Sequence, residues 1–439
     1  MSGKPFILQE GQIDQFGFNA ALKKRTNGNR QTYGITTYLQ RFTVYEDMFS
    51  KFMYCEGIIY DGTGFFSKIG FQTGDILEIT IFKDKNDTAE DRVENEYYIE
   101  SINSNAKLVG TKGANYEFRA VSKIGWVGLT GKLKKSYKGR VSDIVAYLAY
   151  NEPFGISPPK KLMIQQTYGK IVIDAPSMKP FEFIDKLNSY ALVPDNPDNN
   201  FFWFETRVGL VYKNLKRIAN DADVFNYHIM IDKNKNNKEA LKDYHRIQEY
   251  QLKKVNDQLT MYHEGAIDNK TVTYNFLTRK IKTKENSYSK SLLLMGQHFA
   301  FDPEESKNIR QTPKNEKEQV YVRCSSESYP EEKLGDRPEL PSKKWGSSII
   351  QYNMMNQTVL TAKIIGNPYI KPGDIIYIKE AATPQGDEQE EKDPLLSGQF
   401  LVGSARHIVM DAKEYTTILD LYKDGYEQDI STYRRDIKS

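Results

Sequence analysis

The sequence has few of the residues that build disulfide frameworks and no stretch that could form a membrane span. Its two cysteines, Cys55 and Cys324, lie far apart in 439 residues, which favours two buried free thiols and assembly in a reducing cytoplasm. No segment offers 18 consecutive apolar residues, and the opening MSGKPFILQEGQ lacks an apolar h-region. We therefore expect neither a membrane span nor a signal peptide.

Charge of a single sign and clustered histidines are also missing. The chain carries 61 basic and 58 acidic residues, a net charge of +3, which is too small to indicate nucleic-acid binding. Its five histidines are scattered, with no pair three or four positions apart of the kind that a metal-binding helix uses. His407 lies in a strand-like stretch, ARHIVM, where a structural histidine is favoured over a metal ligand.

The sequence patterns of common catalytic and nucleotide sites are absent as well. There is no Cys-x-x-Cys, no Gly-x-x-x-x-Gly-Lys-Ser/Thr loop and no Gly-x-Ser-x-Gly turn. Trp203, within FFWFE, could stack on a sugar, but packing in a core or an interface is favoured. We therefore expect no enzyme, no catalytic residue, no cofactor and no metal site.

Aromatic residues, in contrast, are abundant. The 29 tyrosines and 22 phenylalanines favour pleated sheet surfaces and protein interfaces. From residue 35 onward, blocks of alternating apolar residues are separated by Gly, Asn and Asp, which is the pattern of a sheet that closes into a sandwich or small barrel. The sequence therefore predicts a chain that is mostly β.

A few segments depart from the strand pattern. The composition shifts to Gly and Lys over 126–140, which we interpret as a domain boundary. A helix is predicted with Ser142 as its N-cap, and a second with Pro180 at its first position. A hairpin with its turn at 206–209 should follow, and a further helix is expected over 347–357.

Three other segments have less definite patterns. The segment 232–300 begins with a stretch that fits helix or long strands, and it contains the strand-like KTVTYNFLTRKIKTK. Residues 301–345 are too polar to build a core, so they are predicted as loops or as an insertion that packs on something else. The acidic run at 384–393 is either a solvated hairpin loop or a docking loop.

One short pattern occurs twice. TGDILEI carries Gly74 and Asp75, and PGDIIYI carries Gly373 and Asp374, at the point where a strand begins. Glycine tolerates positive φ and aspartate bonds the backbone of its own turn, so both pairs are predicted to be structural turns. In each unit a tyrosine of a later strand follows the aspartate after 41 positions. The pattern is either the trace of a duplicated domain or common strand chemistry.

The C-terminal order IIGNPYIKPGDIIYI followed by SGQFLVGSARHIVMDAKEYTTILDLY resembles the hub proteins of contractile-tail baseplates. It is similar to the hub of T-even phages and to the hub portions of late-control and type VI spike proteins. The stretch from FEFIDKLNSYA through FFWFETRVGLVY resembles the helix and hairpin of the same family. The likeness extends over 40–425, with its specific motifs in about the last 65 of these residues.

This resemblance implies a mainly β (β+α) chain with two tail-tube-like antiparallel β-barrel domains, a small α+β domain between them and an insertion in the second barrel. The implied divisions are 1–125 for the first barrel, 126–217 for the α+β domain, 218–255 with 345–425 for the second barrel, 256–344 for the insertion and 426–439 for a tail. Family members form trimers, so three chains would supply a ring of six barrels.

The implied function is that of a structural virion protein, the central baseplate hub that joins the hexameric tail tube to the trimeric central spike. Its implied partners are two further copies of itself, the tube protein, the spike protein, baseplate wedge proteins and, transiently, passing DNA, with no membrane contact. It would be assembled in the host cytoplasm and located in the virion. The alternatives are a tail-associated cell-wall hydrolase, which a zymogram would reveal, and a carbohydrate-binding β module.

Overall fold

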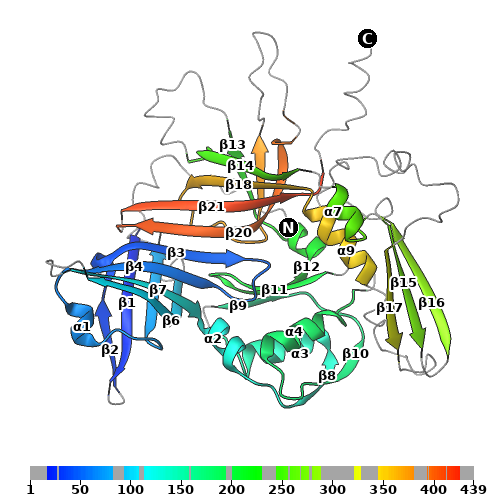
Figure 1. Cartoon of the computed structure of the whole chain (residues 1–439), viewed down its shortest axis with the longest axis horizontal. Coiled ribbons are helices and arrows are strands. Elements are labelled where there is room, and N and C mark those ends of the chain that lie inside the picture. The colour runs from blue at the N-terminus through cyan, green and yellow to red at the C-terminus, as the bar shows by residue number, and fades with distance from the viewer. Residues whose placement is uncertain are drawn as a thin grey trace, which may run out of the picture.

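The computed structural model describes about two thirds of the chain. The described residues are 17–26, 29–82, 93–107, 113–157, 160–193, 200–229, 244–255, 258–266, 268–275, 279–287, 321–327, 345–379, 393, 395–411 and 413–425. They form a mainly β structure dominated by one large sheet, which is antiparallel except for one parallel pair of strands (Figure 1).

The large sheet has 13 strands, and it is an open path from β2 at one end to β14 at the other. Seven strands come from the N-terminal part: β1 Gly17–Thr26, β2 Asn29–Gly34, β3 Leu39–Asp47, β4 Tyr54–Asp61, β5 Ile76–Phe82, β6 Val93–Lys107 and β7 Ala114–Ser122. Six come from the C-terminal half: β13 Val224–His228, β14 Glu249–Val255, β18 Thr358–Ile365, β19 Ile375–Lys379, β20 Gly398–Met410 and β21 Glu414–Lys423. The predicted β class is confirmed, and neither group closes into a barrel within the described residues.

The two groups of strands repeat one order. The first group runs β3-β4-β7-β6-β5-β1, and the second runs β14-β18-β21-β20-β19-β13. We call them the first and the second sheet unit. They are joined edge to edge, because β3 pairs antiparallel with the second half of β20, from Asp47 opposite Ser404 to Arg41 opposite Met410. Figure 1 shows β20 and β21 lying directly beside β3 and β4.

A β-bulge at corresponding places fixes which residues of the two units are equivalent. In β6 the register against β7 shifts between Ile99 and Ser101, and in β20 the register against β21 shifts between Val402 and Ser404. A bulge bends its strand and interrupts the hydrogen-bond ladder at one defined residue, so it marks a fixed position in the register. The repeat is thus visible in the hydrogen-bond ladder as well as in the Gly-Asp turns.

The bulges correct one detail of the sequence argument. They place Ala120 of β7 and Leu421 of β21 at equivalent positions. Four residues earlier in each strand, Tyr116 is therefore equivalent to Thr417. Counting 41 positions from each turn aspartate would instead make Tyr116 equivalent to Tyr415. That alignment is off by two residues, because the strands and loops between the aspartate and the tyrosine differ in length.

Alternation along the strands buries one face of each unit. In β18 every second residue from Thr358 is buried, and in β21 the buried positions alternate from Tyr415. The two cores are separate: Phe42 and Phe118 lie in that of the first unit, Phe400 in that of the second. The opposite face of β3, β4, β7, β20, β21 and β18 carries residues that are mostly half-buried or exposed.

Between the units in sequence lies a smaller α+β part, seen at the bottom of Figure 1. It contains α2 Lys123–Thr130, β8 Ser136–Arg140, α3 Val141–Tyr150, β9 Lys161–Ile164, β10 Lys170–Asp174, α4 Pro180–Asn188, β11 Phe201–Glu205, β12 Gly209–Asn214 and α5 Leu215–Asn220. The helix predicted to begin at Pro180 and the hairpin with its turn at 206–209 are confirmed. Trp203 is buried in the core of this part, as predicted.

The predicted N-cap of α3 is wrong. The helix begins at Val141 with Arg140 at the cap, and Ser142 lies inside its first turn. Ser142 is buried there and exchanges hydrogen bonds with Thr167, whose hydroxyl accepts from the Ser142 backbone N at 2.9 Å. The serine therefore anchors α3 to the segment after β9. The Gly- and Lys-rich stretch interpreted as a boundary also begins inside α2.

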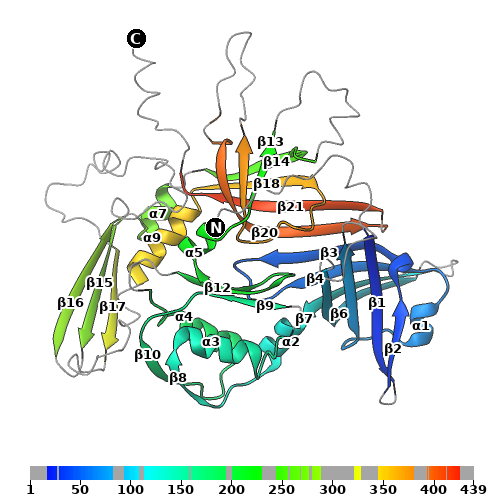
Figure 2. The ribbon, with the colours of Figure 1, turned by 180° about the vertical axis from the view of Figure 1, so that it is seen from behind.

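An insertion lies between β14 and β18. It includes α7 Gln258–His263, a three-stranded sheet and α9 Trp345–Met355, which confirms the helix expected over 347–357. The strands of that sheet are β15 Asp268–Asn275, β16 Lys280–Ser287 and β17 Tyr321–Glu327. The insertion leaves and returns at one point, because Val255 and Thr358 are paired neighbours. The sheet projects beside the rest of the molecule in both views (Figures 1 and 2).

Several sequence predictions fall wholly or partly outside the described residues. Strand β17 lies within the segment predicted to be loops, and the described residues of that segment are otherwise only Trp345. Of the acidic run, only Asp393 is described, and the side chain of Cys324 is not. Cys55 is a buried free thiol, as predicted. None of the helices in the described ranges is long and apolar enough to cross a bilayer.

Candidate functional site

The Gly74-Asp75 turn ties β5 to the bulge of β6. Gly74 has φ +87°, a conformation that glycine adopts without strain, and its N–H donates to the Ile99 carbonyl at 2.8 Å. The Ile99 N–H in turn donates to the Asp75 carbonyl at 2.9 Å. The Asp75 carboxylate accepts from the backbone N–H of Gln72 at 3.1 Å, which closes the turn on itself.

The Gly373-Asp374 turn repeats this arrangement against the bulge of β20. Gly373 has φ +93° and donates to the Val402 carbonyl at 2.8 Å, and Val402 donates back to Asp374 at 2.8 Å. The Asp374 carboxylate accepts from the backbone N–H of Lys371 at 2.9 Å. The same three hydrogen bonds thus occur in both units.

A lysine neutralises the aspartate of each turn, but it comes from different places. Lys24, on β1, lies 3.2 Å from the Asp75 carboxylate and also donates to the Gly70 carbonyl. Lys371, three residues before its partner, lies 2.8 Å from Asp374. Burial raises the pKa of Asp374 to about 6, and the Lys371 ammonium opposes that rise. Neither lysine was identified as a site residue from the sequence.

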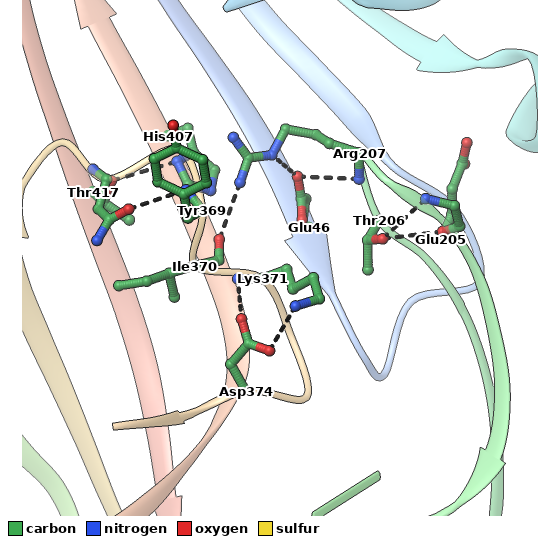
Figure 3. A network of polar contacts seen from close by, with 12 residues as sticks. Glu46, Glu205, Thr206, Arg207, Tyr369, Ile370, Lys371, Asp374, His407 and Thr417 are labelled. Atoms are coloured by element: carbon green, nitrogen blue, oxygen red, sulfur yellow. Dashed lines mark hydrogen bonds and ion pairs between the residues drawn. The ribbon is translucent and has the colours of Figure 1, made fainter. Parts of the chain in front are cut away.

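The two units and the α+β part meet at a buried ion pair (Figure 3). Arg207, in the turn between β11 and β12, donates from Nε to Glu46 of β3 and from Nη2 to the Ile370 carbonyl at 3.0 Å. Both charged side chains are almost fully buried. Burial raises the pKa of the Glu46 carboxyl, and the Arg207 guanidinium opposes that effect. Because a guanidinium stays protonated, Arg207 keeps a positive charge beside Glu46 in this junction.

His407 of β20 lies beside this ion pair. Its side chain is fully buried, and its Nδ1 is 2.8 Å from the Tyr415 hydroxyl and 3.4 Å from that of Thr417. Burial and the charge of Arg207 hold the pKa of His407 well below its usual value, so the ring is neutral. The hydrogen bonds give His407 a packing role at the junction, in line with the structural role predicted for it.

Glu205 forms a second buried link, between the α+β part and the first unit. It is the last residue of β11, and its carboxylate accepts from the Met53 backbone N–H at 3.1 Å and from the Ser122 hydroxyl. Lys160 lies 2.5 Å from its other oxygen. One hairpin therefore supplies both Glu205 and Arg207, and it holds the two sheet units and the α+β part together.

The face of the large sheet opposite the cores, which we call the polar face, carries paired charges among isoleucine, valine and tyrosine side chains. Arg406 and Lys253 both contact Asp420, at 3.0 and 2.9 Å, across β20, β21 and β14. Lys363 similarly contacts Glu249 at 2.9 Å. Such pairs neutralise the face without leaving a strong field of either sign. This polar face and the buried junction behind it are the candidate functional site.

Asp420 makes the most contacts on this face, and its replacement tests their worth. Burial alone would raise its pKa, but hydrogen bonds from Thr361, Lys253 and Ser404 lower the pKa to about 2. We expect Asp420→Asn to lower the free energy of unfolding by about 1–2 kcal/mol at pH 7, allowing for its partial exposure.

The direction of the pKa shift of Asp420 sets the pH dependence of this loss of stability. A carboxyl with a lowered folded pKa stabilises above its unfolded pKa, and that contribution is lost as the pH falls toward about 2. Urea titrations of both proteins between pH 7 and pH 2 should therefore converge at the acid end. Glu414→Gln, at the exposed start of the same strand, is the control. A gap that stays constant over this range would contradict the assignment.

The described residues show no cluster suited to holding a metal ion. No group of three His, Cys, Asp or Glu side chains in these ranges lies close enough to do so. A cavity of about 640 Å³ between β11 and α9 is lined in part by Phe202, His263, Glu264 and Tyr352. Asn353 donates to the Glu264 carboxylate there at 3.0 Å. None of its lining residues belongs to the buried junction.

Comparison with known proteins identifies the fold. No protein-family model and no curated protein sequence matches the chain. The structure is similar to the tail protein from Neisseria meningitidis MC58, at 12% identity and a TM-score of 0.50, covering 94% of this chain and 98% of that one. It is also similar to the 43 kDa tail protein of prophage MuSo2 from Shewanella oneidensis, at 9% identity and a TM-score of 0.52, covering 93% and 98%. The chain has the fold of these phage tail proteins.

Proposed function

We propose that the protein is the central baseplate hub of a contractile tail and that it works as a homotrimer. The observation that carries this proposal is the edge-to-edge junction of two equivalent sheet units within one chain. Closed rings reuse one interface at every step, and this chain already contains one such step. Three copies would supply six sheet units, which matches a hexameric tube on one side and a trimeric spike on the other.

The proposed division of labour follows the earlier domain boundaries. The sheet units, within 1–125 and within 218–255 with 345–425, would form the ring. The α+β part, 126–217, and the insertion, 256–344, would lie outside it, where the spike, tube and wedge proteins could bind. The Gly74-Asp75 and Gly373-Asp374 turns would give β6 and β20 the same bulge geometry, and these are the strands that the ring contacts would use.

The polar face supports the same proposal. On a closed ring of these sheets, one face must line the channel, and the face opposite the cores is the one free to do so. Its paired charges, such as Arg406 with Asp420, would let DNA pass without binding it tightly. The protein would then act by shape and repeated contact, with no catalytic step, in a virion assembled in the host cytoplasm.

The native mass of the purified protein tests the proposal. We expect light scattering to give about 152 kDa, three times the 50.7 kDa of the chain, alone or with a spike partner. Mixed with the tail tube protein from the same genome, the trimer should appear in electron micrographs as a ring at the tube end. A monomer under every condition that also fails to bind tube protein would overturn the hub assignment.

A further inference from the structure

Among the described residues, each sheet unit has one edge without a strand partner that corresponds to a side of the junction between β3 and β20. In the first unit, β5 pairs with β6 only from Val93 to Tyr98, so the edge of β6 from Ser101 to Lys107 has no neighbour there. In the second unit, β18 covers one edge of β14, and no described strand covers the other. Unpaired edges present rows of backbone N–H and C=O groups that can add a strand from another chain.

The junction inside the chain shows how these edges fit together. There, β3 pairs with the second half of β20, beyond the bulge. The bulges make β20 equivalent to β6. The order of strands makes β3 equivalent to β14, since each is the outer neighbour of the strand that pairs with β7 or β21. The equivalent of the internal junction is therefore β14 against the second half of β6.

The ladders also give the register of this pairing. Thr43 of β3 pairs with Glu56 of β4, and Gln251 of β14 pairs with Thr361 of β18 at the equivalent position. On the other strand, Ile408 is equivalent to Ala106, because they face Thr416 and Asn115. Thr43 lies opposite Ile408 within the chain. Gln251 should therefore lie opposite Ala106.

Burial at equivalent positions supports the missing neighbour independently. Phe42, which β20 covers, is 1% exposed, whereas its equivalent Tyr250 on β14 is 46% exposed. Val44 is likewise buried, and its equivalent Leu252 is only half-buried. Tyr250 is thus exposed where the equivalent Phe42 is buried, as expected if the strand that would cover Tyr250 belongs to another copy.

We propose that β14 of one copy pairs antiparallel with the second half of β6 of a second copy, with Gln251 opposite Ala106. This proposal rests on the proposed trimer and specifies its interface. The two copies contribute different strands to the contact, so the contact is head to tail, and three such contacts close a ring. The ring would then consist of one kind of step, made three times within chains and three times between them.

A designed disulfide tests the pairing and its register. Residues opposite each other in an antiparallel pair have Cα atoms about 4.5–5.5 Å apart, within the range that a disulfide spans. We expect Ala106→Cys/Gln251→Cys, in a Cys324→Ser background, to form covalent dimers and trimers under mild oxidation. A non-reducing gel of the native protein, oxidised at low concentration, gives the readout.

Three matched variants serve as controls. Each single cysteine should leave the protein monomeric on the gel, because the proposal pairs β6 with β14 and never either strand with itself. Arg41→Cys/Met410→Cys places cysteines at the equivalent junction inside the chain. It should form an intramolecular disulfide without any larger species, which shows that the pairing geometry allows the bond.

The outcomes separate this proposal from the one on which it rests. Covalent trimers as the end product support both. A native trimer whose Ala106→Cys/Gln251→Cys form does not cross-link, while Arg41→Cys/Met410→Cys does, overturns the strand pairing and leaves the hub assignment standing. A ladder that continues beyond the trimer supports the pairing and overturns the closed trimer. A protein that is monomeric by native mass and does not cross-link overturns both.

Discussion

Replacing Arg207 with methionine should lower the free energy of unfolding by about 3–5 kcal/mol, the cost of removing one partner from a buried ion pair. The Glu46 carboxylate would remain fully buried, without the guanidinium that neutralises it, and the Ile370 carbonyl would lose its donor. Chemical denaturation at pH 7, followed by circular dichroism, measures the loss. Because Arg207 joins the α+β part to both sheet units, we also expect a lower yield of the proposed trimer.

The double variant Glu46→Gln/Arg207→Met provides the first control. It removes the buried charge together with its partner, so it should recover a substantial part of the loss. Arg119→Met, at a surface pair with Glu100, is the second and should cost at most about 1 kcal/mol. An Arg207→Met protein no less stable than Arg119→Met would show that the junction does not depend on this pair.

Replacing Gly209 with alanine should cost about 3 kcal/mol or more, at the upper end of what overpacking a protein interior costs. A Cβ at this position would lie 2.0 Å from the carbonyl oxygen of Lys161 and 2.8 Å from its nitrogen. Both are backbone atoms of β9, which pairs parallel with β12 at this point, so no side-chain rotation can relieve the contact. Tryptophan fluorescence during denaturation, with Trp203 on the adjacent strand β11, reports the change.

Gly34→Ala is the matched control for this variant. A Cβ there would meet no atom within 4 Å, and the residue does not have positive φ. We expect its free energy of unfolding to stay within about 0.5 kcal/mol of the parent. Equal stability of the two alanine variants would mean that β9 can move away from β12 at little cost. The close approach seen in the structure would then not constrain the fold.

Local patterns in the sequence were sufficient to predict many elements. The apolar alternation predicted the strands of the C-terminal unit, and proline at the first helical position located α4. Positive φ at Gly74 and Gly373 follows from what a Gly-Asp turn requires. The N-cap at Ser142 was mispredicted because the serine hydroxyl bonds Thr167, a tertiary contact that no local pattern contains.

The candidate site could not be predicted because its residues meet only through the tertiary fold. Arg207 lies 161 positions from Glu46, and nothing in the local sequence of either residue indicates that the two residues pair. The lysines that pair with the two aspartates come from different places: Lys24 lies on β1, far from Asp75 in sequence, whereas Lys371 lies three residues before Asp374. One weak signal was present in the glycine of the β20 bulge. A Cβ on Gly403 would meet the ring of Tyr422 at 2.1 Å, so this glycine marks the bulge that defines the repeat.

The pairing of Val255 with Thr358 has a consequence for how this chain can change. Two adjacent strands whose ends touch could be connected by a short hairpin turn, yet here the connection holds helices and a sheet of its own. Because the exit and the return coincide, material of any size can be gained or lost there without shifting the register of β14 against β18. A tail lineage could thus exchange whatever this module contacts while the strands proposed to form the ring remain unaltered.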